Sequence, residues 1–452
     1  MQTPEKRLPM FTNRALVGLS VPIILNALFA IAAGLVDSAM VSSAGESAVS
    51  AVSLVDALNM LFIAAFSSTA IGGSVVVAQY IGSRNARQAC VSANQLFYAV
   101  TCIATVLMGA LLCFGEPLLR LVYGNVETDV FEQMKTYFFF VLLGFPFFAM
   151  GEASCAVLRA MGHNTQSTII NVVYNLLNVA GNAILIYGFR LGVAGAAIST
   201  TCSRAVYAAL GLILTHRKSL PAHFEKLLRF RLDKDVMKRV LRVGLANGME
   251  GSLFHVGKIL VASLISSFGT IAIAANSVAN NINMIGWTVV NAFGTVLLTV
   301  VGQCVGAGET EQAKRYTKKM IGAATVTMVV LYGGIFLLRN QLVLLYDFES
   351  EALEAAAYYT GVLALIAMGS LYSFAFVPLS AFRAAGDVRY AVTIAVTSMF
   401  AFRVGLCYVL NALFPGLQLM GIFIGMGVDW IVRTVMNIWR YRSGKWLHKR
   451  LI

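Results

Sequence analysis

Several ionisable side chains lie inside stretches of this chain that are otherwise almost free of charge. The acids are Asp37, Asp56, Glu152, Glu250 and Asp429, and the bases are Arg204, Lys258, Arg403 and Arg433. A charged side chain at the centre of a lipid bilayer costs about 2.5 to 3.5 kcal/mol on insertion scales, so each one needs a partner, a hydrated cavity or a task. An acid that moves between water and a drier environment changes its tendency to hold a proton. The acids are therefore candidates for a proton-coupled switch.

Asp37 has the position best suited to such a switch. It follows Pro22 by fifteen residues, toward the outer end of the first apolar stretch. A proline inside a helix removes one backbone hydrogen bond and allows a bend, which could expose or enclose the carboxylate. The simpler interpretation is a static kink followed by a capped acid.

Charged residues of the second half also fall on shared helical faces. Glu250 and Lys258 are eight residues, or about two helical turns, apart, and His255 is about a quarter turn away. These three residues suit either a charge network between helices or a titrating or substrate-binding site. Asp429 and Arg433 stand four residues apart, which predicts a structural ion pair.

Amide side chains form two polar stripes. One comprises Asn171, Asn175, Asn178 and Asn182, and the other comprises Asn276, Asn280, Asn283 and Asn291. Asp56 and Asn59 share a face in the same way. An unsatisfied amide in hydrocarbon costs several kcal/mol, so these faces contact protein or water rather than lipid. Both a cavity lining and hydrogen bonding between helices would produce this pattern.

The elements that carry these residues are predicted to be transmembrane helices. With 58% hydrophobic and only 12% charged residues, the chain is too apolar to be a soluble globule of its length. Charge-free stretches near or above the roughly 20 residues of a spanning helix include residues 15–36, 57–83, 88–115, 320–338, 355–382 and 404–428. We expect an all-α membrane protein with twelve helices.

The second half repeats the first at a constant offset of 224 residues. The matched pairs include Gly45 with Gly269, Gln79 with Gln303, Arg159 with Arg383, and Gly162 with Gly386. In this register Asp56 and Asn59 correspond to Asn280 and Asn283. A duplicated membrane chain predicts two homologous six-helix bundles with a ligand site near their interface.

The net charge of +13 is distributed by loop rather than in one patch. Basic residues gather in alternate loops, densely over residues 217–242, whereas the other loops are mainly acidic. By the positive-inside rule both termini are cytoplasmic, so the charge reflects topology and not nucleic-acid binding. The predicted organisation is an N-terminal lobe (residues 1–214), a basic cytoplasmic linker (215–240), a C-terminal lobe (241–440) and a basic cytoplasmic tail (441–452).

The linker and the cysteines suggest no further chemistry at this stage. Apolar residues recur along the linker at Phe224, Leu227, Leu228 and Phe230, which is typical of an amphipathic interfacial segment, with a solvated linker that fixes topology as the simpler interpretation. The seven cysteines are scattered without a CxxC motif or paired spacing, so neither disulfides nor a metal site is expected.

Several motifs resemble those of the multidrug and toxic compound extrusion (MATE) family of secondary transporters. The segment around Asp37 reads LVDSAMVSSAGESAVSAVSL and is similar to the family's first-helix aspartate and the loop after it. The duplicated segments VVVAQYIGSRN and VVGQCVGAGE, and the turns LRAMGH and FRAAGD, resemble further family motifs in the family's order.

The resemblance implies export of amphipathic organic cations or drugs in antiport with H+ or Na+, by alternating access between the two lobes. It assigns ion coupling to Asp37, Asn178, Asn182 and Thr200, and the bend of the first helix to Pro22. Asn182 departs from the family pattern, because many members carry an aspartate there. Glu250 matches an acid that another branch uses, so it joins His255, Lys258, Asp56, Asn59, Asn280 and Asn283 as secondary candidates.

The resemblance also implies a small-molecule substrate, a plasma (inner) membrane location, a monomer, and no cofactor besides the coupling ion. An ATP-driven pump is disfavoured because no GxxxxGK[ST] sequence is present, and no hydrolase motif supports an enzyme. Two alternatives stay open. Lys258 and Arg403 could admit anions, as in a lipid-linked oligosaccharide flippase of the same superfamily, and a receptor without transport belongs to a different class.

Overall fold

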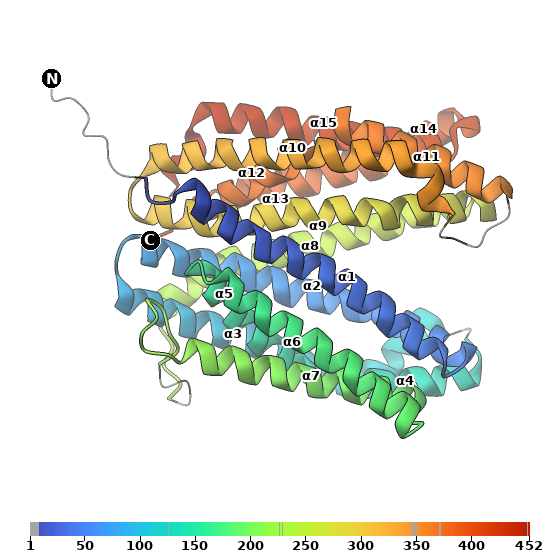
Figure 1. Cartoon of the computed structure of the whole chain (residues 1–452), viewed down its shortest axis with the longest axis horizontal. Coiled ribbons are helices and arrows are strands. Elements are labelled where there is room, and N and C mark those ends of the chain that lie inside the picture. Colours follow the sequence, from blue (N-terminus) through green and yellow to red (C-terminus); the bar gives the residue numbers. More distant parts are fainter. Residues whose placement is uncertain are drawn as a thin grey trace. The chain divides into compact units, whose positions relative to one another are not determined.

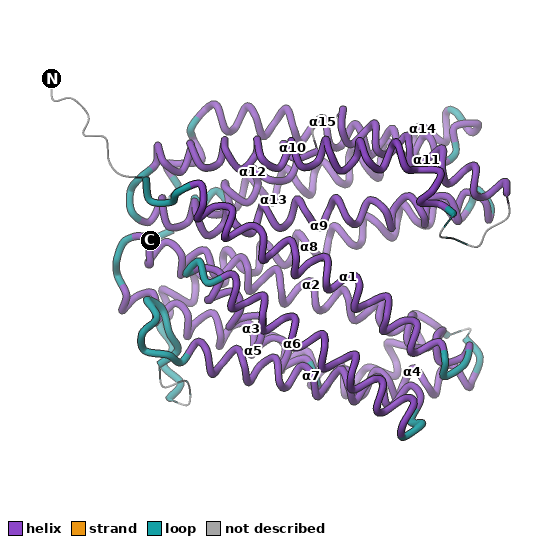
Figure 2. The backbone as a smooth tube through the Cα atoms, in the orientation of Figure 1, coloured by secondary structure: helices purple, strands orange, loops and turns teal. Residues whose placement is uncertain are grey.

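The computed structural model describes residues 9–124, 126–225, 227, 229–344, 346, 350–369, 372–449 and 451–452. Within this part of the chain every regular element is a helix and no strand is present (Figures 1 and 2). Eleven of the described helices are long and apolar enough to cross a membrane, or twelve if one bent pair counts as a single span. The predicted all-α membrane fold with twelve spans is therefore confirmed. Residues 1–8, 228 and 450, which include Leu228 of the predicted linker, lie outside the described residues.

One compact unit comprises Val21–Met249. Its complete helices are α2 (Glu46–Gly82), α3 (Ala86–Tyr123), α4 (Thr128–Leu143), α5 (Phe145–Ala160), α6 (Asn164–Asn182), a π-helix (Ala183–Gly188) and α7 (Gly192–Thr215). Within this unit α5 packs on α2, α3 and α7, and α6 packs on α7, as the blue and green ribbons of Figure 1 show. The candidate coupling residues of the first half all belong to this unit.

The other unit comprises Met1–Ser20 and Glu250–Ile452. Its complete helices are α9 (Thr270–Gly306), α10 (Thr310–Val343), α11 (Ser350–Gly369), α12 (Tyr372–Ala384), α13 (Val388–Ser398), a π-helix (Met399–Gly405), α14 (Leu406–Leu413) and α15 (Leu419–Ser443). A 3-10 turn at Pro415–Leu417 joins α14 to α15, and another at Lys445–His448 follows α15. Here α9 packs on α10, α11 and α12, and α12 packs on α15.

Two long helices contribute to both units. Helix α1 (Asn13–Ser42) changes unit after Ser20, two residues before Pro22, and α8 (Lys234–Ser266) changes unit after Met249. These are the first helices of the two repeated halves. In each half the beginning of the first helix belongs to the unit that the other half forms. The lobe boundaries predicted at residues 214 and 240 stay a prediction.

The duplication is visible in the backbone at the turns. Gly45 precedes α2 with φ 107°, and Gly269 precedes α9 with φ 92°. L-residues other than glycine rarely adopt these angles, so the same glycine is needed at both matched turns. The turn at Gly269 is thus part of a repeated feature.

Breaks inside the spans have local causes. Helices α4 and α5 meet at Gly144 with a bend of 43°, and Pro146 occupies the first turn of α5, where its missing N–H leaves no bond unmade. The two π-helices follow α6 and α13 directly, the corresponding helices of the two halves, although not at matched positions, since Ala183 corresponds to Cys407. Such wide turns are often found at functional sites.

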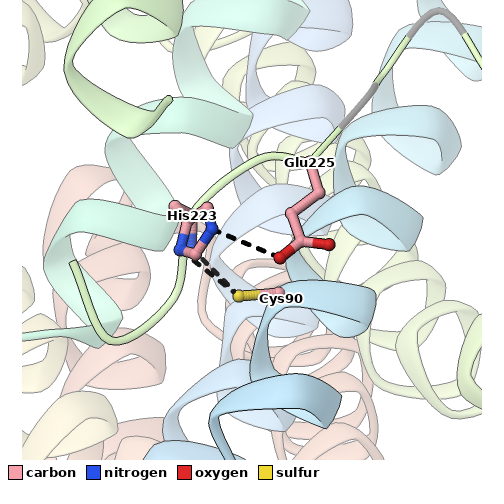
Figure 3. Close-up of side chains that lie close together, drawn as sticks. All are labelled: Cys90, His223 and Glu225. Atoms are coloured by element: carbon pink, nitrogen blue, oxygen red, sulfur yellow. Dashed lines mark hydrogen bonds and ion pairs between the residues drawn. The ribbon is translucent and has the colours of Figure 1, made fainter. Parts of the chain in front are cut away.

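The linker between α7 and α8 is held against α3 by hydrogen bonds to its backbone. Asn94 Nδ2 donates to the carbonyl of Glu225 (2.9 Å), and Gln95 Nε2 donates to that of Arg231 (2.7 Å). Phe224 is buried against Phe97, with ring centroids 5.2 Å apart. Beside these contacts, Cys90 of α3 lies next to His223 and Glu225 of the linker (Figure 3).

Candidate ion-coupling site

The structure brings Asp37 and Asn182 into direct contact. Asp37 lies on α1 and is half-buried, and Asn182 is the fully buried last residue of α6. Asn182 Nδ2 donates a hydrogen bond to Asp37 Oδ1. The partner of this carboxylate is thus a neutral amide.

Asn178 and Thr200 form a second pair one helical turn away. Asn178 Nδ2 donates to Thr200 Oγ1 (3.2 Å), and the Thr200 hydroxyl donates to the Ala196 carbonyl (2.9 Å). Asn178 and Asn182 are four residues apart on α6, so they share one face of that helix. The four residues assigned from the family motifs therefore form two hydrogen-bonded pairs along the same helix face.

Asn182 stands directly before the π-helix Ala183–Gly188. Its Oδ1 atom is buried and has no hydrogen-bond donor among the described residues. Buried amide oxygens are normally satisfied, and an exception calls for a reason. Because Asn182 contacts the Asp37 carboxyl group, its Oδ1 is suited to accept a hydrogen bond from that group when the carboxyl is protonated.

Asp56 and Asn59 form a polar group on α2. Asp56 Oδ1 accepts from the Tyr137 hydroxyl (3.1 Å) and from Asn59 Nδ2 (3.5 Å). The charges of Asp56 and Asp37 interact electrostatically. Asp56 therefore acts electrostatically on the primary acid, and Asn59 is hydrogen-bonded to Asp56.

Tyr137 and Arg204 have parts in this group that the sequence analysis did not assign. Arg204 is buried and interacts electrostatically with both Asp56 and Tyr137. Its Nη1 donates to the Val141 carbonyl (3.1 Å), and its guanidinium lies 5.5 Å from the Phe148 ring centroid. The sequence identified Arg204 as a costly base within a span, but nothing in its spacing connected it with Asp56.

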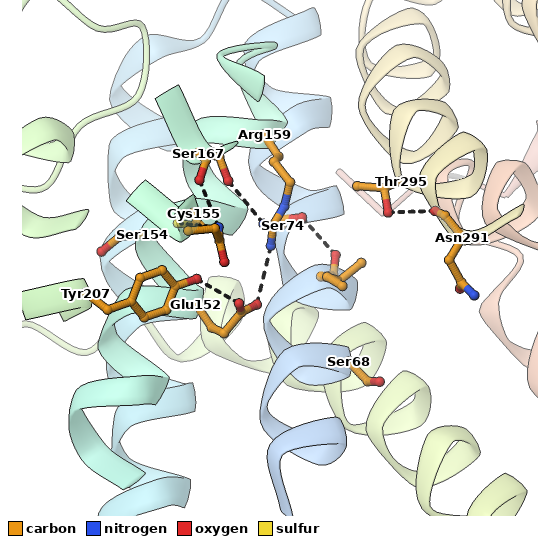
Figure 4. A network of polar contacts seen from close by, with 12 residues as sticks. Ser68, Ser74, Glu152, Ser154, Cys155, Arg159, Ser167, Tyr207, Asn291 and Thr295 are labelled. Atoms are coloured by element: carbon orange, nitrogen blue, oxygen red, sulfur yellow. Dashed lines mark hydrogen bonds and ion pairs between the residues drawn. The ribbon is translucent and has the colours of Figure 1, made fainter. Parts of the chain in front are cut away.

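Glu152 belongs to a separate network in the same unit (Figure 4). The Tyr207 hydroxyl donates to Glu152 Oε1 (2.8 Å), and Arg159 Nη2 lies 3.4 Å from Glu152 Oε2. Arg159 Nη1 also donates to Ser167 Oγ (3.2 Å). Each oxygen of this buried carboxylate has a donor, so the network holds α5, α6 and α7 together.

Glu250 pairs with Arg383 in the other unit. Arg383 Nη2 lies 2.6 Å from Glu250 Oε2, and both side chains are mostly buried. Among the described residues no ion pair joins Glu250 to Lys258. Of the two interpretations of this group, the observed contacts of Glu250 fit the charge network between helices.

Lys258 and His255 lie on the same helix beyond this pair. Lys258 Nζ is 5.8 Å from the Phe254 ring centroid, and the Arg403 guanidinium is 5.5 Å from the same ring. The charge of Lys258 acts on both His255 and Arg403. Two cations therefore gather at Phe254, which itself stacks on Trp287 with centroids 5.5 Å apart.

The predicted pair of Asp429 and Arg433 forms, with Arg433 Nε 2.8 Å from Asp429 Oδ1. Ser398 also donates to Asp429, and Arg403 Nη1 lies 4.0 Å from its other oxygen. Asp429 is completely buried. Its carboxylate thus compensates two buried guanidinium groups.

Asn280 and Asn283, the repeat partners of Asp56 and Asn59, are used in hydrogen bonds. Asn280 Nδ2 donates to Asn276 Oδ1 (2.8 Å), and the Tyr332 hydroxyl donates to Asn283 Oδ1 (2.5 Å). A tyrosine from a neighbouring helix thus contacts one member of this polar pair in each half, Asp56 in the first and Asn283 in the second. Asn283 is therefore used between helices, and Asn280 within α9.

Pro22 lies inside α1, which is one α-helix from Asn13 to Ser42. The Pro22 carbonyl accepts a hydrogen bond from Thr168 Oγ1 of α6 (3.1 Å). Helix α6 therefore contacts α1 at its proline and, through Asn182, at its acid.

Comparison with known proteins adds the family of the chain. A family model described as MatE matches residues 22–184 and 248–409, one segment in each half. The chain is 26% identical to an uncharacterized transporter, YisQ, of Bacillus subtilis, over 96% of this chain and 95% of that protein. It is 23% identical to the probable multidrug resistance protein NorM of Thermotoga maritima, over 98% and 95% of the two chains. A crystal structure of MATE in the bent conformation superposes with a TM-score of 0.88 at 20% identity, covering 96% of each chain, which supports the fold.

Proposed function

This chain belongs to the MatE family, and we propose that it exports amphipathic organic cations in exchange for H+, with Asp37 as the proton-exchanging carboxylate. The chain is a multi-pass membrane transporter and not an enzyme. Relatives named as multidrug resistance proteins support efflux as the direction of transport. The proposal includes a plasma (inner) membrane location with both termini in the cytoplasm, and a monomer as the working form.

The observation that carries the proposal is the contact between Asp37 and Asn182. The other two acids that the sequence analysis placed inside spans of this unit are compensated by stronger partners, because Asp56 has the Tyr137 hydroxyl and the charge of Arg204 nearby, and Glu152 is paired with Arg159. Asp37 accepts from a neutral amide. A carboxyl group with a neutral partner can change protonation state without leaving a cation unpaired.

The amide of Asn182 offers a partner for each state of Asp37. The ionised carboxylate accepts from Nδ2, whereas a protonated Asp37 could donate to Oδ1, the buried acceptor without a donor, after a turn of the amide. Both states would then be satisfied by hydrogen bonds. Proton binding would thereby select between two local arrangements of α1 against α6.

Pro22 provides a way for α1 to follow that change. A proline leaves one helical hydrogen bond unmade, which weakens the helix at this point. We propose that protonation of Asp37 alters the bend of α1 at Pro22 and thereby biases the alternating access of the two repeated halves. Because exchange of one H+ for one monovalent cation moves no net charge, the pH gradient supplies the energy, about 1.4 kcal/mol for each tenfold difference in H+ concentration.

The same contacts argue for H+ over Na+. A hard cation is bound by several oxygen ligands, often including more than one carboxylate. Here the Nδ2 donor of Asn182 is directed at Asp37, and the Thr200 oxygen already accepts from Asn178. Both interactions use oxygens that a cation would need.

A second candidate function is transport of organic or lipid-linked anions. It is favoured by Lys258 and Arg403, two cations next to the aromatic ring of Phe254. Anionic aromatic groups would find charge and stacking partners there. A receptor without transport has no observation in its favour.

Flux in proteoliposomes tests the proposal. Wild-type protein and Asp37→Asn are reconstituted in tight vesicles, and uptake of a fluorescent organic cation is followed under an imposed pH gradient or Na+ gradient. We expect flux that depends on the pH gradient and is lost in Asp37→Asn. Glu116→Gln, at an exposed acid outside the site, is the matched control.

Asn182→Asp sharpens the distinction between the two ions. It places a second carboxylate next to Asp37 and removes the competing Nδ2 donor. We expect this variant to gain dependence on Na+. Wild-type flux that follows the Na+ gradient and ignores the pH gradient would contradict H+ coupling, and transport of anions alone would favour the second candidate.

A further inference from the structure

We propose that Cys90, His223 and Glu225 form a binding site for a transition-metal ion of the Zn2+ class, where the linker meets α3. Their potential ligand atoms, one from each side chain, all lie within 4.8 Å of one another (Figure 3). Thiolate, imidazole and carboxylate are the ligands that Zn2+ commonly takes in proteins. This site is separate from the coupling residues on α1, α6 and α7.

The distances are close to what a small ion requires. His223 Nε2 lies 3.3 Å from Glu225 Oε1, Cys90 Sγ lies 3.5 Å from the other ring nitrogen, Nδ1, and one ligand atom from each of the three side chains lies within 4.8 Å of the others. Zinc takes sulfur at about 2.3 Å and nitrogen or oxygen at about 2.0 to 2.2 Å in tetrahedral sites, so its ligand atoms are more than 3 Å apart. Small rotations of the three side chains would therefore direct them at one ion.

The imidazole is oriented as in known metal sites. His223 Nδ1 lies 3.2 Å from the Leu220 carbonyl, so a hydrogen on Nδ1 can be donated to this oxygen. That tautomer leaves the lone pair of Nε2 free on the side of Glu225. Metal-bound histidines usually donate their other ring nitrogen to a carbonyl or carboxylate in this way.

Asn94 fixes the position of Glu225. Its Oδ1 accepts from the Glu225 backbone N–H (3.2 Å), and its Nδ2 donates to the Glu225 carbonyl (2.9 Å). Asn94 and Cys90 are four residues apart on α3 and therefore share one face. The helix thus presents a ligand and, one turn later, a clamp for the backbone that carries another ligand.

Burial is graded across the group. Cys90 is buried, the His223 side chain is 16% exposed, and that of Glu225 is 61% exposed. The exposed side gives an ion a path from water and room for a water molecule as fourth ligand. A thiolate in the set favours Zn2+ over Ca2+ or Mg2+, which prefer oxygen ligands.

The competing interpretation is a simple ion pair between His223 and Glu225. Such a pair does not require Cys90, whereas the metal site requires all three side chains. Dependence on the thiol therefore separates the two interpretations. A bound ion would also tie the linker to α3, so it would protect Cys90 from alkylation.

The test uses the full-length protein in detergent, without an affinity tag, after treatment with a chelator and exchange into metal-free buffer. Zn2+ binding is measured by titration and by elemental analysis after desalting. We expect one tightly held ion per chain, lost in Cys90→Ser and in His223→Gln. Cys102→Ser and Cys202→Ser, which alter exposed cysteines outside the group, are the controls that should retain it.

A variant of the supporting shell provides a second measurement. Asn94→Ala leaves all three ligands in place, and we expect Zn2+ affinity to fall by about 10-fold or more, as for other outer-shell partners. Alkylation of Cys90 in the wild-type protein, followed by peptide mass spectrometry, should slow when Zn2+ is added. This readout requires no variant to fold.

Binding that is equal in wild type and Cys90→Ser, with no protection of Cys90 by Zn2+, would overturn the proposal. The group would then be an ion pair with a neighbouring thiol.

Discussion

At positions that the duplication aligns, the first half of the chain carries Asp56 and Asn59 where the second half carries Asn280 and Asn283. The primary acid, Asp37, corresponds to Val261, and Glu250 of the second half corresponds to Asn26. Acids were thus placed independently in the two halves, although the matched arginines Arg159 and Arg383 each bind a glutamate.

The partners of the acids differ between the halves. In the second half Glu250 is bound by Arg383, and Asp429 is bound by Arg433. In the first half Glu152 is likewise bound by Arg159, and Asp56 lies near the charge of Arg204, but Asp37 accepts from the neutral amide of Asn182. A guanidinium beside a carboxyl group is left uncompensated when that group takes up a proton, whereas a neutral amide can stay hydrogen-bonded to it in either state. We infer that the first half couples the ion and that the second half uses its charges for stability.

The largest expected effect on stability is at Asp429. Asp429→Asn removes the charge that compensates two buried guanidinium groups, those of Arg403 and Arg433. Loss of one partner of a buried ion pair costs about 3 to 5 kcal/mol. Thermal unfolding in detergent should show a large fall in the midpoint. Glu116→Gln, at an exposed pair, should not change it, and an unchanged Asp429→Asn protein would argue against a structural role for this acid.

Glu250→Gln should have a smaller effect on stability and leave transport in place. Its pair with Arg383 keeps some exposure, and a hydrogen bond to a charged group contributes about 1.5 to 3 kcal/mol. The unfolding midpoint and the flux of the same preparation are measured together. A stable Glu250→Gln protein without flux would place ion coupling in the second half as well.

The two tyrosines give the smallest and most closely matched test. Tyr137→Phe removes a donor to Asp56, and Tyr332→Phe removes a donor to Asn283. Each lost hydrogen bond should cost about 0.5 to 1.5 kcal/mol. Because only Tyr137 contacts an acid, only Tyr137→Phe should alter the pH dependence of transport. Equal pH profiles of transport for the two variants would show that Asp56 does not influence the proton-dependent step.

Much of the fold could be predicted from the sequence. Charge-free stretches predict the membrane spans, and the constant offset between the halves predicts the repeat. Gly45 and Gly269, with their similar positive φ angles, agree with that repeat. The bend at Gly144 and the π-helices could not be predicted, because they depend on packing between helices. The amino-acid composition also does not predict that α1 and α8 each belong partly to one unit and partly to the other.

The candidate site could be predicted only in part. Asp37 and Asn182 are 145 residues apart, and family motifs rather than spacing connected them. Tyr137 and Arg204 were missed as partners of Asp56, because no spacing along the chain connects either residue with Asp56, although Arg204 stood out as a base inside a span. Cys90 and His223 are 133 residues apart, so no motif of closely spaced ligands could reveal them.

Proton movement itself tests the difference between the halves most directly. Wild-type protein, Asp37→Asn and Glu250→Gln are each reconstituted in vesicles that enclose a pH-sensitive dye. The pH inside the vesicles is followed when substrate is added. We predict that substrate drives proton movement in wild type and in Glu250→Gln, and that Asp37→Asn shows none. Proton movement that persists in Asp37→Asn and disappears in Glu250→Gln would contradict the account.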